Sequence, residues 1–139
     1  CLVGSEMCIR DRSAGGWGTL AYASRPHRRV AALVAMAPGR GGHEGGQANS
    51  NCSPDALIAA AGRFGRTART PILWIDGTAD SYFGPELSRA LYGSFSAAGG
   101  RAEFVQPAGA GHGLFFSSGG SATWGPLVEA YLAQRRAGP

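Results

Sequence analysis

The chain of 139 residues is long enough for one domain at most, and a hydrophobic content of 44% is typical of a globular protein rather than a disordered one. All 13 basic residues are arginine, which GC-rich codons explain, and they are scattered without interleaved aromatic side chains, so the net charge of +4 predicts no nucleic-acid partner. The chain has no long apolar run, so it predicts no membrane span. The three cysteines lack metal-ligand spacing, so no zinc or iron–sulfur site is expected. The compartment and the oligomeric state stay open.

The first twelve residues differ in character from the rest of the chain. The stretch from Leu2 to Asp11 resembles one reading frame of a transposase adapter that is used to prepare short-read DNA libraries. We therefore expect residues 1–12 to be a non-native, adapter-derived segment that carries no information about the fold. Native sequence is then expected to begin near Ser13, in a gene from a metagenomic assembly, with everything upstream missing.

From Ser13 onward, helical and strand patterns alternate along the chain. Residues 13–24 predict a tight turn that runs into a helix, and its small residues would let that helix lie close to a sheet. The apolar run over residues 30–36 is typical of a parallel strand buried on both faces. Further strands are expected over residues 71–75 and 102–105, further helices over 54–61, 85–98 and 123–136, and a long polar loop over 39–51.

This alternation predicts an α/β fold with a parallel sheet and helices on both of its faces. Three strands are too few to complete such a sheet. We therefore expect a partial fold whose N-terminal strands are missing, with residues 13–139 as the C-terminal part of a larger domain.

Ser13 is the first residue with a chemical interpretation. A serine nucleophile on a strand-to-helix turn stands within Gly-x-Ser-x-Gly, because the turn presses its flanks against neighbouring backbone. Ser13, Ala14 and Gly15 match the second half of that motif, and Asp11 occupies the position of the upstream glycine. A serine that only caps the following helix is the alternative interpretation.

An acidic pair follows the second expected strand. Asp76 stands at the end of that strand and Asp80 stands in the loop after it, within Gly77-Thr78-Ala79-Asp80. In hydrolases whose serine stands on such a strand-to-helix turn, the catalytic acid follows a strand in a Gly-x-x-Asp loop. Asp80 is therefore preferred over Asp76 as the catalytic acid. The non-catalytic role expected for Asp76 is an Asx turn or a hydrogen bond to nearby backbone.

His112 lies in a glycine-rich loop after the third expected strand. The glycines on either side of it would let this loop carry an imidazole to the edge of the sheet, near the serine and the acid. Neither His27, at a helix end, nor His43, in the polar loop, has such a setting, although His43 could reach the site. The chain order Ser13, Asp80, His112 is that of the α/β-hydrolases and not of other serine hydrolase folds.

Together these residues carry a resemblance to the bacterial dienelactone hydrolase-like branch of the α/β-hydrolases. It covers essentially residues 13–136 and rests, besides the three sites, on Ser13-Ala14-Gly15-Gly16, Phe64-Gly65-Arg66-Thr67-Ala68-Arg69, Trp74-Ile75, Tyr82-Phe83-Gly84-Pro85 and Ala97-Ala98-Gly99-Gly100-Arg101. The resemblance implies a hydrolase with a catalytic triad. Authentic dienelactone hydrolases use a cysteine nucleophile, so the serine here favours a general carboxylic ester as substrate.

The implied mechanism gives each candidate residue a role. His112 accepts the proton as Ser13 attacks an ester carbonyl, and Asp80 orients the imidazole and stabilises its cation. The backbone N–H of Ala14 supplies one oxyanion donor, while the second is expected from a missing upstream loop. No cofactor is implied. The expected substrate-binding residues, each with a role in the core as the alternative, are Tyr82, Phe83, Leu114 and Phe115.

Two other functions stay open at this point. A prolyl-oligopeptidase-like peptidase shares the catalytic domain and the motif order, and a non-catalytic α/β binding domain would use the serine only as a helix cap. We also expect the isolated 139-residue polypeptide to be inactive and poorly folded, because it lacks about half of a complete sheet and exposes a strand edge.

Overall fold

Strand β3 (Val30–Met36) lies in the middle of the sheet, as expected from its continuous apolar run. In the computed structural model, which describes residues 2–3 and 6–136, the strand order is β1-β2-β3-β4-β5. The other strands are β1 (Leu2–Val3), β2 (Glu6–Arg12), β4 (Ile72–Ile75) and β5 (Ala102–Val105). The four strands from β2 to β5 are parallel, and only the short β1 pairs antiparallel to its neighbour. The predicted strands thus form β3, β4 and β5.

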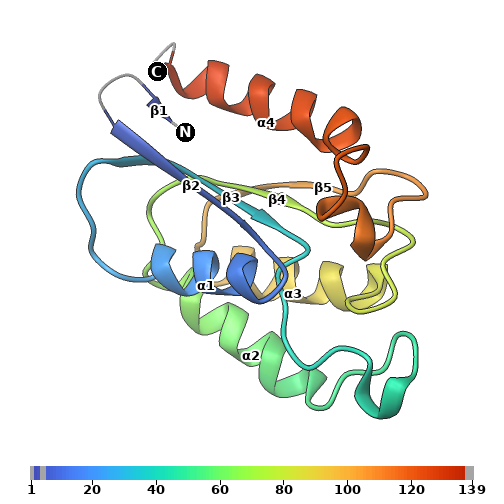
Figure 1. Cartoon of the computed structure of the whole chain (residues 1–139). Coiled ribbons are helices and arrows are strands. Elements are labelled where there is room, and N and C mark those ends of the chain that lie inside the picture. The colour runs from blue at the N-terminus through green and yellow to red at the C-terminus, as the bar shows by residue number, and fades with distance from the viewer. Residues whose placement is uncertain (1, 4–5, 137–139) are drawn as a thin grey trace.

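Helices cover both faces of this sheet, as predicted (Figure 1). The α-helices are α1 (Ala14–Ala23), α2 (Pro54–Gly65), α3 (Pro85–Ala97) and α4 (Ser121–Arg136), and the short 3-10 helices are η1 (Glu44–Gly46) and η2 (His112–Phe115). Figure 1 shows α1, α2 and α3 on one side of the sheet and α4 on the other. Helix α2 extends about one turn beyond its predicted end near Gly62, because Gly62 and Gly65 both pack closely against α3.

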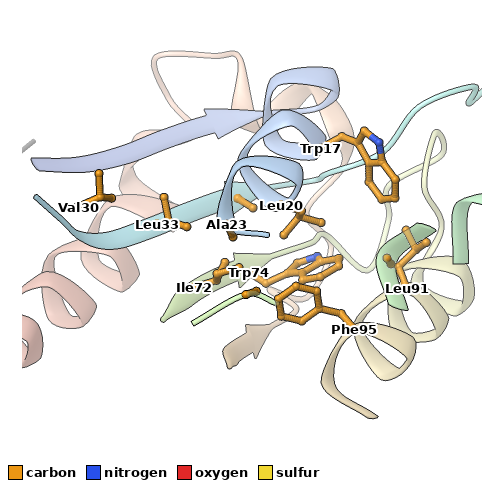
Figure 2. Close-up of a cluster of buried hydrophobic side chains, with 12 residues drawn as sticks. Trp17, Leu20, Ala23, Val30, Leu33, Ile72, Trp74, Leu91 and Phe95 are labelled. Carbon is orange, nitrogen blue, oxygen red and sulfur yellow. The ribbon is translucent and has the colours of Figure 1, made fainter. Parts of the chain in front are cut away.

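Two apolar clusters hold these layers together. One lies between the sheet and the side of α1 and α3, where Trp74 is completely buried and contacts Phe95 edge-on (Figure 2). The second lies between the opposite face of the sheet and α4, and includes Val34, Phe115 and Tyr131. Because successive side chains of a strand point to opposite faces, β3 supplies residues to both clusters. The catalytic candidates are therefore carried by loops on a firmly packed scaffold.

The segment before Ser13 differs from expectation. Residues 1–12 were expected to carry no information about the fold, yet Glu6–Arg12 forms β2 and pairs with β3 from Met7 to Arg12. The physical reason is the edge of β3, whose backbone N–H and C=O groups need partners, and the turn at Ser13 places the preceding residues beside it. The adapter origin of the segment stays a prediction, and Cys1, Gly4 and Ser5 lie outside the described residues.

No helix in the described part of the chain is long and apolar enough to cross a membrane.

Candidate active site

Ser13 occupies a strained turn between β2 and α1. Its backbone has φ 53° and ψ −125°, in the left-handed half of the Ramachandran map that residues other than glycine rarely adopt. The turn is fixed by the Ser13 N–H, which donates to the Met36 carbonyl at 2.8 Å, and by the Ser13 carbonyl, which accepts from the Trp17 N–H at 2.9 Å. Although Ser13 stands at the N-cap position of α1, its hydroxyl makes no capping hydrogen bond. The hydroxyl is thus presented away from the helix.

The glycines that follow Ser13 make room for this turn. A Cβ on Gly16 would lie 2.9 Å from the Met36 carbonyl oxygen, so the helix could not approach β3 as closely with a side chain there. A Cβ on Gly15 would overlap the carboxyl group of Asp11. Asp11 can therefore stand in the place of the upstream glycine of the motif because Gly15 leaves space for it.

Asp80 is held by the tight loop that follows β4. Its side chain is buried, and Oδ1 accepts hydrogen bonds from the N–H groups of Tyr82 at 2.7 Å and Phe83 at 3.0 Å. A Cβ on Gly77 would overlap the Ala110 carbonyl, which shows how closely this loop packs against the loop that carries His112. The second carboxylate oxygen of Asp80 remains available to an imidazole.

His112 joins the serine to the acid. Its Nδ1 lies 2.7 Å from Asp80 Oδ2, and its Nε2 lies 3.1 Å from Ser13 Oγ. Both distances are hydrogen-bonding distances, and Nδ1–H facing the carboxylate leaves Nε2 as the acceptor for the serine hydroxyl. The His112 side chain is 11% exposed while that of Asp80 is fully covered, so the imidazole can be reached from solvent. The three residues lie in the arrangement of a nucleophile, a base and an orienting acid.

Asp76 has a different environment from Asp80. It is fully buried, and its Oδ2 accepts a hydrogen bond from Trp74 Nε1 at 2.6 Å. Burial away from water raises the pKa of Asp76 well above its ordinary value, the Trp74 hydrogen bond lowers it, and the charge of Asp80 raises it further. Asp76 bonds to an indole rather than to backbone and does not reach His112.

The four expected substrate-binding residues fall into different environments. Tyr82 is 39% exposed, and its ring centroid lies 4.6 Å from that of His112. Phe83 is buried with its ring edge-on to His112 at 5.5 Å, so it supports the imidazole from within the protein. Leu114 is partly buried, while Phe115 is 1% exposed and packs in the α4-side core rather than beside His112.

The aromatic residue that follows Phe115 was not among the expected substrate-binding residues. Phe116 is 52% exposed, lies 5.4 Å from the His112 ring and carries the Arg12 guanidinium 4.7 Å above its own ring. The run Leu114-Phe115-Phe116 is too short to show a periodicity, so the sequence offered no signal for which ring faces the core.

The other two histidines lie at different distances from the site. His27 follows the C-terminal end of α1, where its ring stacks on Tyr22, and its Nε2 lies 3.1 Å from the hydroxyl of Thr70 before β4. Ser13 and Asp80 lie at the opposite ends of these two elements. His43 does approach the site, since it stacks on Tyr82 at 3.6 Å. Among the described residues, no group of three or more His, Cys, Asp or Glu side chains is arranged to hold a metal ion.

Comparisons with known proteins identify the fold. No protein-family model matches the sequence, and no curated protein gives a significant sequence match. Among solved structures, Est1E from Butyrivibrio proteoclasticus superimposes with a TM-score of 0.68 at 15% identity over 95% of this chain and 62% of its own. A Klebsiella pneumoniae protein assigned as a dienelactone hydrolase gives 0.66 at 20% identity, over 91% of this chain and 51% of its own. SOBER1 of Arabidopsis thaliana gives 0.61 at 23% identity, over 92% and 52%.

These likenesses extend over nearly the whole of this chain, whereas the chain spans only about half to three fifths of each of those structures. The parallel strands β2 to β5 and the helices on both faces match the expected partial architecture. The chain therefore has an α/β-hydrolase fold.

Proposed function

We propose that this chain carries the catalytic residues of a serine hydrolase that cleaves carboxylic esters through an acyl-enzyme. The observation that supports this most strongly is the Ser13 hydroxyl. It stands at a helix N-cap position yet makes no capping bond, and instead lies 3.1 Å from His112 Nε2. A serine that served only as a cap would bond to the first turn of its helix.

The proposed mechanism follows from the geometry. His112 accepts the hydroxyl proton at Nε2 while Ser13 Oγ bonds to the carbonyl carbon of the ester, and the resulting imidazolium is stabilised by Asp80 through Nδ1–H. His112 then donates that proton to the departing alkoxide, which leaves as the alcohol. In the second half of the reaction His112 removes a proton from water while the water oxygen bonds to the acyl carbon. The bond between that carbon and Ser13 Oγ then breaks, His112 returns the proton to Oγ, and the carboxylic acid leaves. The Ala14 N–H, at the positive end of α1, is one donor to the oxyanion.

The test is steady-state hydrolysis of p-nitrophenyl acetate and butyrate by the complete protein, expressed with the upstream sequence of its gene. We expect Ser13→Ala and His112→Ala to lower kcat by a factor on the order of 10⁴ to 10⁶, because nucleophile and base act as a unit. Ser118→Ala, in an exposed turn after η2, is the matched control and should leave kcat unchanged. Unaltered turnover in Ser13→Ala would refute the proposal.

The same preparation separates this proposal from the two alternatives. We expect the esters to be cleaved far faster than aminoacyl p-nitroanilides, whereas a peptidase would cleave both at comparable kcat/KM. A non-catalytic binding domain would show no turnover of either probe, and no difference between the wild type and Ser13→Ala.

A further inference from the structure

Tyr82 lies between two imidazole rings. On one side the His43 ring is stacked on it, with centroids 3.6 Å apart and planes 9° apart. On the other side the His112 ring faces it with centroids 4.6 Å apart and planes inclined by 32°. The three rings come from separate segments: the loop after β3, the turn after Asp80, and the start of η2. Such a sandwich restricts the rotation of the central ring.

His43 is itself anchored to the turn that carries Tyr82. Its Nε2 lies 2.9 Å from the hydroxyl of Ser81, and the Ser81 carbonyl accepts a hydrogen bond of 2.6 Å from the N–H of Asn49 in the same loop. Gly42 brings the loop against Tyr82, since a Cβ there would lie 2.7 Å from the Tyr82 carbonyl oxygen. The loop over residues 39–51 thus clamps residues 81 and 82 by stacking, hydrogen bonding and close backbone contact.

The clamped turn touches the proposed catalytic residues in two ways. The Tyr82 N–H donates to Asp80 Oδ1 at 2.7 Å, and the Tyr82 ring covers one side of His112. The face of an aromatic ring carries partial negative charge and attracts a cation, so it favours an imidazolium over a neutral imidazole. Phe116 is a weaker candidate for this role, because it lies farther away, at 5.4 Å, and already faces the Arg12 guanidinium.

We infer that Tyr82, clamped by His43, is a positioning residue that stabilises the His112 imidazolium formed when Ser13 attacks. This inference rests on the proposed hydrolase function. In this role the Tyr82 ring acts on the proposed base, His112, and does not form the wall of a substrate pocket. It also gives the long polar loop a role, because that loop holds Tyr82 in place through His43.

The experiment compares Tyr82→Phe, Tyr82→Leu and His43→Leu in the complete protein, with p-nitrophenyl butyrate as substrate. Tyr82→Leu removes the aromatic face, and we expect kcat to fall about three- to tenfold with KM unchanged, from the usual strength of a cation–ring contact. Tyr82→Phe keeps the face and should retain nearly the wild-type kcat. His43→Leu releases the clamp and should lower kcat in the same direction, with no further loss when combined with Tyr82→Leu.

Phe116→Leu is the matched control, because it removes an exposed ring at a greater distance from His112 and should change kcat less than Tyr82→Leu. Thermal unfolding midpoints identify any variant that fails to fold, and His43→Leu keeps the test decisive if Tyr82→Leu is one of them. A rise in KM alone, equal losses in Tyr82→Phe and Tyr82→Leu, or wild-type kcat in the leucine variants would overturn the inference. A wild type no more active than Ser13→Ala would instead overturn the proposed function.

Discussion

At the scale of single residues, two carboxyl groups four positions apart experience opposite environments. Asp80 accepts two backbone N–H bonds and faces His112, while Asp76 is fully buried and accepts a hydrogen bond from the Trp74 indole. Among the described residues, Asp76 Oδ1 has no hydrogen-bond partner. A carboxyl group in such a place is most stable when protonated, so Asp76 and Asp80 can lie close together without two buried negative charges.

Replacing Asp76 by Asn tests this assignment. Because the pKa of Asp76 is raised by folding, its stabilising contribution is complete below the ordinary pKa of 3.8 and is lost as pH rises through the higher folded value. Each unit of elevation corresponds to about 1.4 kcal/mol. We expect the unfolding free energy of Asp76→Asn in the complete protein, measured by urea denaturation, to exceed that of the wild type by an amount that grows as the pH rises above 4 toward the folded pKa of Asp76.

The control for that measurement is Asp55→Asn, which changes an exposed carboxylate in the first turn of α2. Its effect should be small, within about 0.5 kcal/mol, and nearly constant above pH 5. A constant difference between Asp76→Asn and the wild type across this range would show that Asp76 is ionised in the folded protein.

At the scale of elements, glycines decide how closely α2 and α3 approach one another. A Cβ on Gly65 would overlap the carbonyl group of Phe95, whereas Gly93, within α3, has open space where its Cβ would stand. Both residues lie in helices, Gly65 as the last residue of α2 and Gly93 inside α3, so alanine gains helix propensity at both positions and more of it at Gly93. A loss of stability at Gly65 therefore reports packing, because propensity favours alanine.

We expect Gly65→Ala to lower the unfolding free energy by about 1–3 kcal/mol, because backbone must move to admit the methyl group. Gly93→Ala should raise it by up to about 1 kcal/mol through helix propensity. Chemical denaturation of the complete protein and of its two variants measures both changes in unfolding free energy. Equal effects at the two positions would mean that the helices do not pack as closely as described.

The elements that sequence could predict are those with a strong local pattern. The apolar run of β3 and the glycine-ended helix α3 needed no tertiary information, and the chain order of Ser13, Asp80 and His112 located the candidate site. Strand β2 was missed because its pairing depends on the edge of β3 rather than on its own composition. The stack of His43 on Tyr82 was also beyond prediction, since the two residues are brought together only by the fold of a long loop.

At the scale of the whole molecule, most of the outer edge of β2 is open. In the described residues, β1 pairs with β2 only at Glu6 and Met7, so Ile9 to Arg12 have no strand on their outer side. An unpaired strand edge exposes N–H and C=O groups and invites association between chains. Est1E and the Klebsiella pneumoniae protein are about 1.6 and 2 times as long as the part that this chain matches, as their coverages of 62% and 51% indicate.

We expect the isolated 139-residue polypeptide to unfold without a sharp transition and to show no esterase turnover, because the outer edge of β2 is open from Ile9 to Arg12 and because we expect the second oxyanion donor to come from upstream sequence. The complete protein should unfold cooperatively and turn over p-nitrophenyl esters. Scanning calorimetry and steady-state kinetics on the two proteins make the comparison. A cooperative, active 139-residue chain would show that the described elements are sufficient by themselves.

The central claim is that His112 and Asp80 activate Ser13 as a nucleophile. Labelling of the complete protein with a fluorophosphonate, followed by peptide mass spectrometry, tests it most directly, because this probe bonds to serine hydroxyls that a neighbouring base has activated. We expect the label on Ser13 in the wild type and its loss in His112→Ala. A label on another serine, or equal labelling of Ser13 in both proteins, would contradict it.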